Sequence, residues 1–239
     1  MFGYPTLAST YMDAKVLISL VSVALGWLLA QGTAFVKDWW AARKLKAGLL
    51  TELEDIEAQL QGVVVMHSRH LQIYANKGME PAVPIPIHNM FFRQYFKEAF
   101  SHLNREQRIS YQLIHSTLDS LNAKHGVLEK LLEEFHKERT ASPSEERTLA
   151  TINMWGDRVT AAYKTAMVIR WHILYHKRNP KAPAFDFMGP MHESYIKFEQ
   201  ELDDEVKLIL DKAKGITREA FERVYDPNAF LRARGAGSQ

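Results

Sequence analysis

The sequence of residues 16–36, VLISLVSVALGWLLAQGTAFV, contains no charged side chain, and its one strongly polar residue is Gln31. As an α-helix with a rise of about 1.5 Å per residue, this segment is about 30 Å long, which matches the hydrocarbon thickness of a bilayer. Helices buried inside water-soluble proteins seldom run this far without a charge. We therefore predict one transmembrane helix over residues 16–36.

Charged and aromatic residues flank this apolar segment unequally. Lys15 precedes it beside Asp13. The residues after it are more basic and include two tryptophans: Lys37, Trp39, Trp40, Arg43, Lys44 and Lys46. Positive charge near a span marks the cytoplasmic side, and Trp favours the headgroup layer. We expect residues 1–15 outside the cell, these six residues at the membrane interface and the rest of the chain in the cytoplasm.

A cleaved signal peptide is the alternative to a membrane anchor. Residues 32–34 (Gly-Thr-Ala) resemble the small-residue site at which signal peptides are cut. Signal peptides, however, carry their positive charge before the apolar run, whereas this chain carries it afterwards. The charge order favours the anchor.

Small residues recur at every fourth position along the predicted span: Ser22, Gly26, Ala30 and Ala34. This spacing places them on one stripe of a helix, where small side chains let two helix backbones approach closely. We predict that the stripe is a self-association face and that the chain forms a homo-oligomer. The alternative is that the stripe reflects only how common Gly, Ala and Ser are in spans.

Composition limits the classes of function. A chain of 239 residues has room for one anchor and one domain, and a net charge of +2 is too small to indicate a nucleic-acid partner. The absence of cysteine excludes disulfides, thiolate metal ligands and cysteine nucleophiles. We expect membrane lipids as partners and no nucleic acid.

The helical spacing of apolar side chains continues beyond the span, through Leu45, Leu49, Leu53, Ile56, Leu60 and Val63. No proline or C-cap signal interrupts it before Gly62. We predict a juxtamembrane helix over residues 37–75, continuous with the span and disturbed at Gly62. A continuous helix would pass rotation of the span to the following domain.

Residues 76–88, NKGMEPAVPIPIH, break the helical pattern because they contain three prolines. Val83, Ile85 and Ile87 alternate with proline, which indicates a loop lying on the domain; a proline-rich ligand for a partner is the alternative. Residues 89–102 then carry aromatic side chains at helical spacing: Phe91, Phe92, Tyr95, Phe96 and Phe100. We interpret these as core, with a lipid- or ligand-binding face as the alternative.

A long amphipathic helix is predicted after Asn104. Asn104 and Gln107 have the spacing of a capping box, in which each side chain bonds the backbone N–H of the other residue. The inward positions have heptad spacing: Tyr111, Ile114, Leu118, Leu121, His125, Leu128, Leu132 and Phe135. We interpret His125 as a satisfied core histidine or as one that reaches the edge of this seam.

A second long helix is predicted with Ser142 as its N-cap and Pro143 as its first residue, ending before Pro180. Its inward positions also have heptad spacing: Ile152, Trp155, Val159, Ala162, Ala166, Ile169, Ile173 and His176. A loop with buried Phe185 and Phe187 should follow. We then expect a shorter helix over residues 217–225, preceded by a long one over residues 191–214 whose inward positions are Met191, Tyr195, Phe198, Leu202, Val206 and Ile209.

These segments predict an all-α protein in which one N-terminal transmembrane helix continues into a cytosolic antiparallel helical bundle. We place the bundle at residues 76–234. Residues 235–239 should form a disordered tail.

The ten histidines raise the question of metal binding. Two pairs share a helical face: His67 with His70, and His172 with His176. The second pair lacks the intervening glutamate of a zinc protease motif. Glu133 and His136 form a single Glu-x-x-His, whereas a di-iron bundle needs two. We predict no metal site, no cofactor and no catalytic residue; the alternative is a membrane-tethered enzyme or metal-binding domain that uses His172 and His176.

Three stretches, RKLKAGLLTELEDIEAQL (43–60), VPIPIHNMFF (83–92) and ISYQLIHSTLDSLNAKHGVLEKL (109–131), resemble a diffuse class of bacterial single-pass membrane proteins. The resemblance extends to about residue 135. It implies an inner-membrane anchor, an all-helical cytosolic domain and, as in some members, an effector role in anti-phage defence. It implies no catalytic residues.

We therefore expect a non-enzymatic, membrane-anchored protein that self-associates and whose domain senses or recruits a cytosolic protein partner. As a defence effector, it would perturb the membrane through clustered spans.

Overall fold

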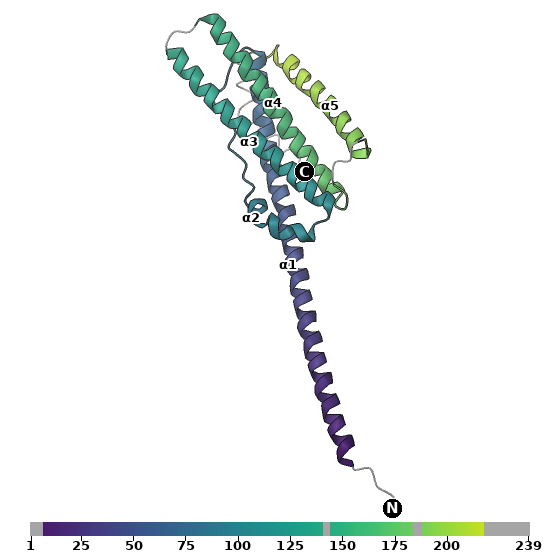
Figure 1. Ribbon diagram of the computed structural model, residues 1–239. Helices are drawn as coiled ribbons and strands as arrows, with labels where there is room; N and C mark the ends of the chain where they lie inside the picture. Colours follow the sequence, from purple (N-terminus) through teal and green to yellow (C-terminus); the bar gives the residue numbers. More distant parts are fainter. Residues whose placement is uncertain (1–6, 141–143, 184–187, 218–239) are drawn as a thin grey trace, which may run out of the picture.

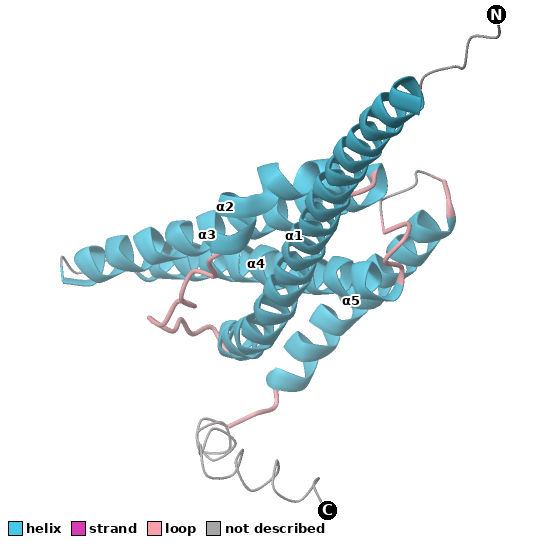
Figure 2. Cartoon of the chain, turned by 90° about the horizontal axis from the view of Figure 1, so that it is seen from below, coloured by secondary structure: helices cyan, strands magenta, loops and turns pink. Residues whose placement is uncertain are grey.

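The computed structural model describes residues 7–140, 144–183 and 188–217 (Figure 1). All regular secondary structure within these ranges is helical (Figure 2): α1 (Leu7–Ala75), α2 (Met90–Ala99), the 3-10 helix η1 (Phe100–His102), α3 (Arg105–Thr140), α4 (Glu145–Arg178) and α5 (Pro190–Ala213). The predicted all-α class is confirmed.

Helix α1 is one uninterrupted helix of 69 residues, which corresponds to a length of about 100 Å. Its N-terminal half extends away from the molecule, and its C-terminal half lies among the other helices (Figure 1). The predicted continuity through residues 37–75 is confirmed, but the disturbance expected at Gly62 is absent. Gly62 is exposed, and a Cβ added there would meet no atom. Its buried neighbours Leu60 and Val63 hold the helix in place on the other side.

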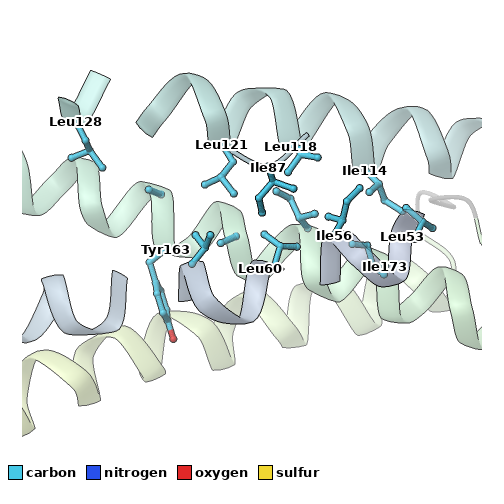
Figure 3. Packing of buried hydrophobic residues seen from close by; sticks show 14 of the residues in the cluster. Leu53, Ile56, Leu60, Ile87, Ile114, Leu118, Leu121, Leu128, Tyr163 and Ile173 are labelled. Atoms are coloured by element: carbon cyan, nitrogen blue, oxygen red, sulfur yellow. The ribbon is translucent and has the colours of Figure 1, made fainter. Parts of the chain in front are cut away.

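We call the packed part of the molecule, the described residues from 45 to 217, the head. Within it α1 packs against α2, α4 and α5, and α3 packs against α4. Figure 3 shows Leu53, Ile56 and Leu60 of α1 near Ile114 and Leu118 of α3. Each fully buried aliphatic side chain contributes about 1.5–3 kcal/mol through the hydrophobic effect. These contacts are the main source of stability of the head.

The predicted inward positions lie in this core. All eight named positions of α4 are buried. In α3 the seam from Tyr111 to Leu132 is buried, and Phe135 is half-buried. In α5 the residues Met191, Leu202 and Val206 are buried. The period of the apolar residues therefore identified the buried face of each long helix.

The capping box at the start of α3 is confirmed. The Gln107 N–H donates to Asn104 Oδ1 at 2.8 Å, and the Asn104 N–H donates to Gln107 Oε1 at 3.1 Å. The same side chains also donate to the connection after α4: Asn104 Nδ2 to the Lys181 carbonyl at 3.0 Å and Gln107 Nε2 to the Pro180 carbonyl at 2.9 Å. This cap therefore ties the start of α3 to the end of α4.

The predicted N-cap of α4 is wrong. The cap is Ser144, whose hydroxyl accepts the Arg147 N–H at 3.3 Å. Ser142 and Pro143 lie outside the described residues. A cap at Ser144 places Glu145 and Glu146 in the first turn, where the partial positive charge of the helix N-terminus favours them. Phe185, Phe187 and most of the segment 217–225 also lie outside the described residues.

The proline-rich connection lies on the head only in part. Ile87 is buried and Val83 is half-buried, but Ile85 is 83% exposed, so the expectation for Ile85 is wrong. The buried residues of this run are Pro84 and Ile87. Their spacing of three matches the three residues per turn of polyproline II. A period of two, as in a β-strand, would have buried Val83, Ile85 and Ile87 on one side, and this connection does not follow it.

Helix α2 is attached to α1 through Glu52. The Glu52 carboxylate accepts the Phe91 N–H at 2.7 Å and the Phe92 N–H at 2.9 Å, both in the first turn of α2. One turn earlier on α1, Gly48 leaves room for the Phe91 ring, which an added Cβ would overlap. Burial raises the pKa of Glu52, and the two hydrogen bonds oppose that rise.

The aromatic side chains of α2 are core residues in part. Phe91, Phe92 and Phe96 pack against the buried cluster. Phe100 differs, since it is 42% exposed. The core interpretation is therefore wrong for Phe100, because the chain turns from α2 into η1 at that residue.

Candidate functional site: membrane anchor and buried histidines

The N-terminal half of α1 has no contact with the head that would cover its apolar side chains. Every residue from 16 to 41 is exposed. Of the helices in the described ranges, α1 is the one long and apolar enough to cross a membrane, and none of its most apolar window is buried. Such a surface is not stable in water, because exposed apolar area is unfavourable there. The segment therefore needs an apolar environment from outside the chain.

The predicted small-residue stripe lies on this exposed half of α1. All four of its members, Ser22, Gly26, Ala30 and Ala34, are exposed, and the unbroken helix keeps them in one line. A Cβ added at Gly26 would meet no atom. The Ser22 hydroxyl donates to the Ile18 carbonyl at 2.8 Å, so it is satisfied within its own helix. The stripe is thus open to a second helix and contains no unsatisfied polar group.

The predicted interface residues form a belt directly after the apolar segment. Lys37, Trp39, Trp40, Arg43, Lys44 and Lys46 are all exposed. The Trp39 and Trp40 rings meet edge to face at 5.9 Å, and the Arg43 guanidinium lies 5.5 Å from the centre of the Trp39 ring. Aromatic rings with adjacent cations suit the boundary between acyl chains and headgroups.

A set of buried histidines lies inside the head. Among the described residues, six histidines are buried: His67, His70, His115, His125, His172 and His176. The sequence pattern drew attention to all of them except His115. That residue follows Ile114 and lies beside the heptad seam, so its spacing carried no signal.

Three of these histidines meet where α1, α3 and α4 pack together. His67 Nε2 and His125 Nε2 are 3.0 Å apart, a distance at which one ring donates and the other accepts. The His70 ring lies 5.5 Å from that of His67 and 5.4 Å from that of Trp155. Both nitrogens of His70 and the Nδ1 atoms of His67 and His125 have no hydrogen-bond partner. His125 is therefore a core histidine satisfied at one nitrogen only.

Burial keeps these three rings neutral. Desolvation lowers the pKa of His67 to about 3 and those of His70 and His125 to about 4. The neighbouring histidines add to the effect for His67 and His125. Near His70, Glu80 opposes the shift and Arg69 adds to it. At neutral pH the cluster carries no charge.

His115 lies between α2 and α3. Its ring stacks on Phe92 with centroids 3.8 Å apart, and Asn89 Nδ2 donates to His115 Nδ1 at 3.4 Å. Because Nδ1 then accepts, Nε2 carries the proton, and it faces the Glu52 carboxylate at 3.8 Å. Burial lowers the pKa of His115 to about 3.

The His172 and His176 rings do not converge on one point. His176 Nδ1 is 2.8 Å from the Ser110 hydroxyl, and its ring contacts Tyr111 of α3. His172 instead stacks on Tyr195 of α5. Within the described ranges, no group of three or more His, Asp or Glu side chains is placed to hold one metal ion. The geometry therefore lends no support to a metal site at this pair.

No protein-family model, curated protein or solved structure matches this chain. The function is accordingly argued from its own residues.

Proposed function

We propose that the chain is a non-enzymatic, single-pass membrane protein with residues 16–36 in the bilayer. The observation that carries this proposal is the complete exposure of that apolar segment on a helix whose other half belongs to the core of the head. A bilayer supplies the apolar surroundings that the head does not. The belt of Trp and basic residues after the segment supports the same placement.

The head lies on the cytoplasmic side, and the short N-terminus lies outside. The excess of positive residues after the span supports this orientation. The resemblance to bacterial single-pass proteins suggests the cell inner membrane. We further propose that the C-terminal half of α1 forms an antiparallel bundle with α3, α4 and α5; the short connection between Thr140 and Glu145 supports an antiparallel arrangement of α3 and α4.

Self-association through the small-residue stripe is the second part of the proposal. The stripe is uncovered and free of unsatisfied polar groups. A homo-oligomer of spans would gather several heads, which would then sense or recruit a cytosolic protein. Clustering of the spans would also be the means of membrane perturbation in a defence effector.

The test of self-association compares two pairs of substitutions in a membrane two-hybrid reporter. Gly26→Leu with Ala30→Leu puts bulk on the stripe and should lower the signal about tenfold, because close helix approach is lost. Ala24→Leu with Gly32→Leu puts the same bulk on the opposite face and should leave the signal unchanged. Equal signals from both pairs would remove the stripe from the proposal.

Orientation is tested with single cysteines, since the natural chain has none. Gln61 is exposed on the part of α1 that lies in the head, so Gln61→Cys supplies an accessible labelling site there. A membrane-impermeant maleimide should label it only after the cells are permeabilised. Labelling in intact cells would place the head outside and contradict the proposed topology.

A further inference from the structure

The end of the head next to the span, together with the part of α1 that joins it to the span, is strongly basic, and we call this region the base. It is formed by residues 37–46, 97–108 and 177–181, which are far apart in the sequence. These three stretches contain ten Lys and Arg against three Asp and Glu, whereas the rest of the chain contains twenty against twenty-five. The small net charge of the whole protein is therefore the sum of a positively charged base and a negatively charged remainder of the chain.

Contacts in the head bring the three stretches to one level along α1. A cavity of about 350 Å³ is lined by residues of all three stretches and by an acidic residue of α1 that pairs with Lys177: Lys46, Leu50 and Glu54 of α1, Leu103, Gln107 and Tyr111 near the start of α3, and His176, Lys177 and Pro180 at the end of α4. The hydrogen bonds from Asn104 and Gln107 fix this junction. Figure 1 shows that the exposed half of α1 leaves the head at this end.

The base also presents apolar groups beside its cations. Phe100 is 42% exposed, and the Arg108 guanidinium lies 4.4 Å from the centre of its ring. Ile109 is 38% exposed on the neighbouring turn. Exposed aromatic and aliphatic side chains among Lys and Arg are typical of surfaces that lie on anionic lipid.

The span sets the distance between the base and the membrane. Lys46 follows the last apolar residue, Val36, by ten positions, or about 15 Å of helix. The polar layer of a leaflet is about 6 Å thick, so Lys46, where the first stretch meets the other two, lies about 9 Å beyond that layer, close to one Debye length at physiological salt. An average helix tilt of about 20° would bring one side of the base nearer still.

We infer that the base binds the anionic headgroups of the leaflet through which its own span leaves the bilayer. Because α1 is one continuous helix, binding tilts the whole molecule so that the base comes closer to an anionic surface, and a neutral membrane does not favour this tilt. This inference rests on the proposed span. The partner of the base is a lipid surface with net negative charge. Two observations support this partner: the base is positively charged, and only ten positions along the helix separate Lys46 from the end of the apolar segment.

Energy transfer in vesicles tests the inference on the full chain. A donor dye is placed on Ser101→Cys at the base or on Asn153→Cys in α4, far from the base, with an acceptor on lipid headgroups. Vesicles are made of phosphatidylcholine alone or mixed with phosphatidylglycerol. Transfer from residue 101 should rise with the anionic lipid and fall again at high salt, whereas transfer from residue 153 should not rise.

Charge-matched variants identify the surface. Lys97→Gln, Arg105→Gln and Arg108→Gln together should abolish the rise at residue 101. Lys124→Gln, Lys130→Gln and Lys212→Gln, which remove the same charge away from the base, should retain it. Lys177 is left unchanged because it pairs with Glu54 and Glu57. Far-UV circular dichroism confirms that each variant is folded.

Two outcomes separate the inference from the proposed function. Chains that float with the vesicles but show equal transfer in neutral and anionic lipid would overturn docking of the base and leave the span intact. An equal loss of transfer in both triple variants would also overturn it, because net charge alone would then be responsible. Chains that do not float with vesicles would contradict the span itself.

Discussion

Glu52 connects two helices through a single carboxylate. It lies on α1, is almost fully buried, and accepts two backbone N–H groups from the first turn of α2. A negative charge at a helix N-terminus is stabilising, and more so when it is partly buried. His115 Nε2 lies 3.8 Å from the same carboxylate, so Glu52 and His115 form one buried polar cluster inside the head.

Replacing Glu52 by Gln should destabilise the head. The amide has one acceptor oxygen in place of two and no charge, so at least one N–H of α2 loses its partner. We expect a loss of about 1–2 kcal/mol in the free energy of unfolding, measured by urea denaturation in detergent. Glu54→Gln removes an exposed carboxylate that pairs with Lys177 at 3.7 Å and should cost about 0.5 kcal/mol or less. Equal losses would contradict the capping role.

Gly156 marks a place where α4 and α1 approach closely. A Cβ added there would overlap the ring of Tyr74. Gly156→Ala should therefore destabilise the protein by about 1–3 kcal/mol, although Ala is the better helix former. Gly62→Ala is the matched control, since a Cβ there meets no atom, and it should stabilise by up to about 1 kcal/mol. Thermal unfolding of both variants gives the comparison, and a stabilising Gly156→Ala would disprove the close approach.

At the scale of elements, one side chain of α3 holds the C-terminal end of the proline-rich connection. Asn122 Oδ1 accepts the Ile87 N–H at 3.0 Å, and Asn122 Nδ2 donates to the Ile87 carbonyl at 2.8 Å. This pair of bonds mimics backbone pairing and fixes the path of the chain into α2. Earlier in the connection, Arg69 Nε of α1 donates to the Glu80 carboxylate at 2.6 Å.

Asn122→Ala should release this connection without unfolding the long helices. The two backbone groups of Ile87 lose their partner, which we expect to lower stability by about 1–3 kcal/mol. Amide hydrogen exchange should rise in residues 83–92 and stay slow in α3 and α4. Ser120→Ala removes an exposed hydroxyl of the same helix, contacted by Lys124, and should change neither measurement. Uniform exchange across all helices in Asn122→Ala would show that the connection does not open separately.

At the scale of the whole molecule, the buried histidines predict how stability depends on pH. Their folded-state pKa values are lowered to about 3–4 from about 6.5. The unfolded chain therefore binds more protons than the folded chain between these values. Stability is fully present above pH 6.5 and falls as the pH drops towards 4, by up to about 1.4 kcal/mol per pH unit for each independent histidine.

Thermal unfolding of the detergent-solubilised chain between pH 7 and pH 5 measures this dependence. His70→Leu should reduce the slope, because it removes one titrating group and no hydrogen bond. A transition temperature that stays constant down to pH 5 would show that the histidines are not buried as neutral rings.

The sequence by itself determined the all-helical class and the long apolar segment of α1. Apolar spacing located every long helix and its buried face, Asn104 and Gln107 marked the start of α3, and residues 16–36 had the length and lack of charge of a span. These signals are local, because helix period, capping and bilayer thickness each depend on one continuous segment. The cap of α4 was misplaced, since two nearby serines satisfy the same local rule.

Only the tertiary structure decided which distant side chains meet. It placed His67 against His125, attached α2 to Glu52 and joined residues 97–108 and 177–181 at the basic end of the head. It also exposed Ile85 and Phe100 against the local pattern. These features depend on how several helices pack together, and no period within one segment encodes the contacts that one helix makes with another.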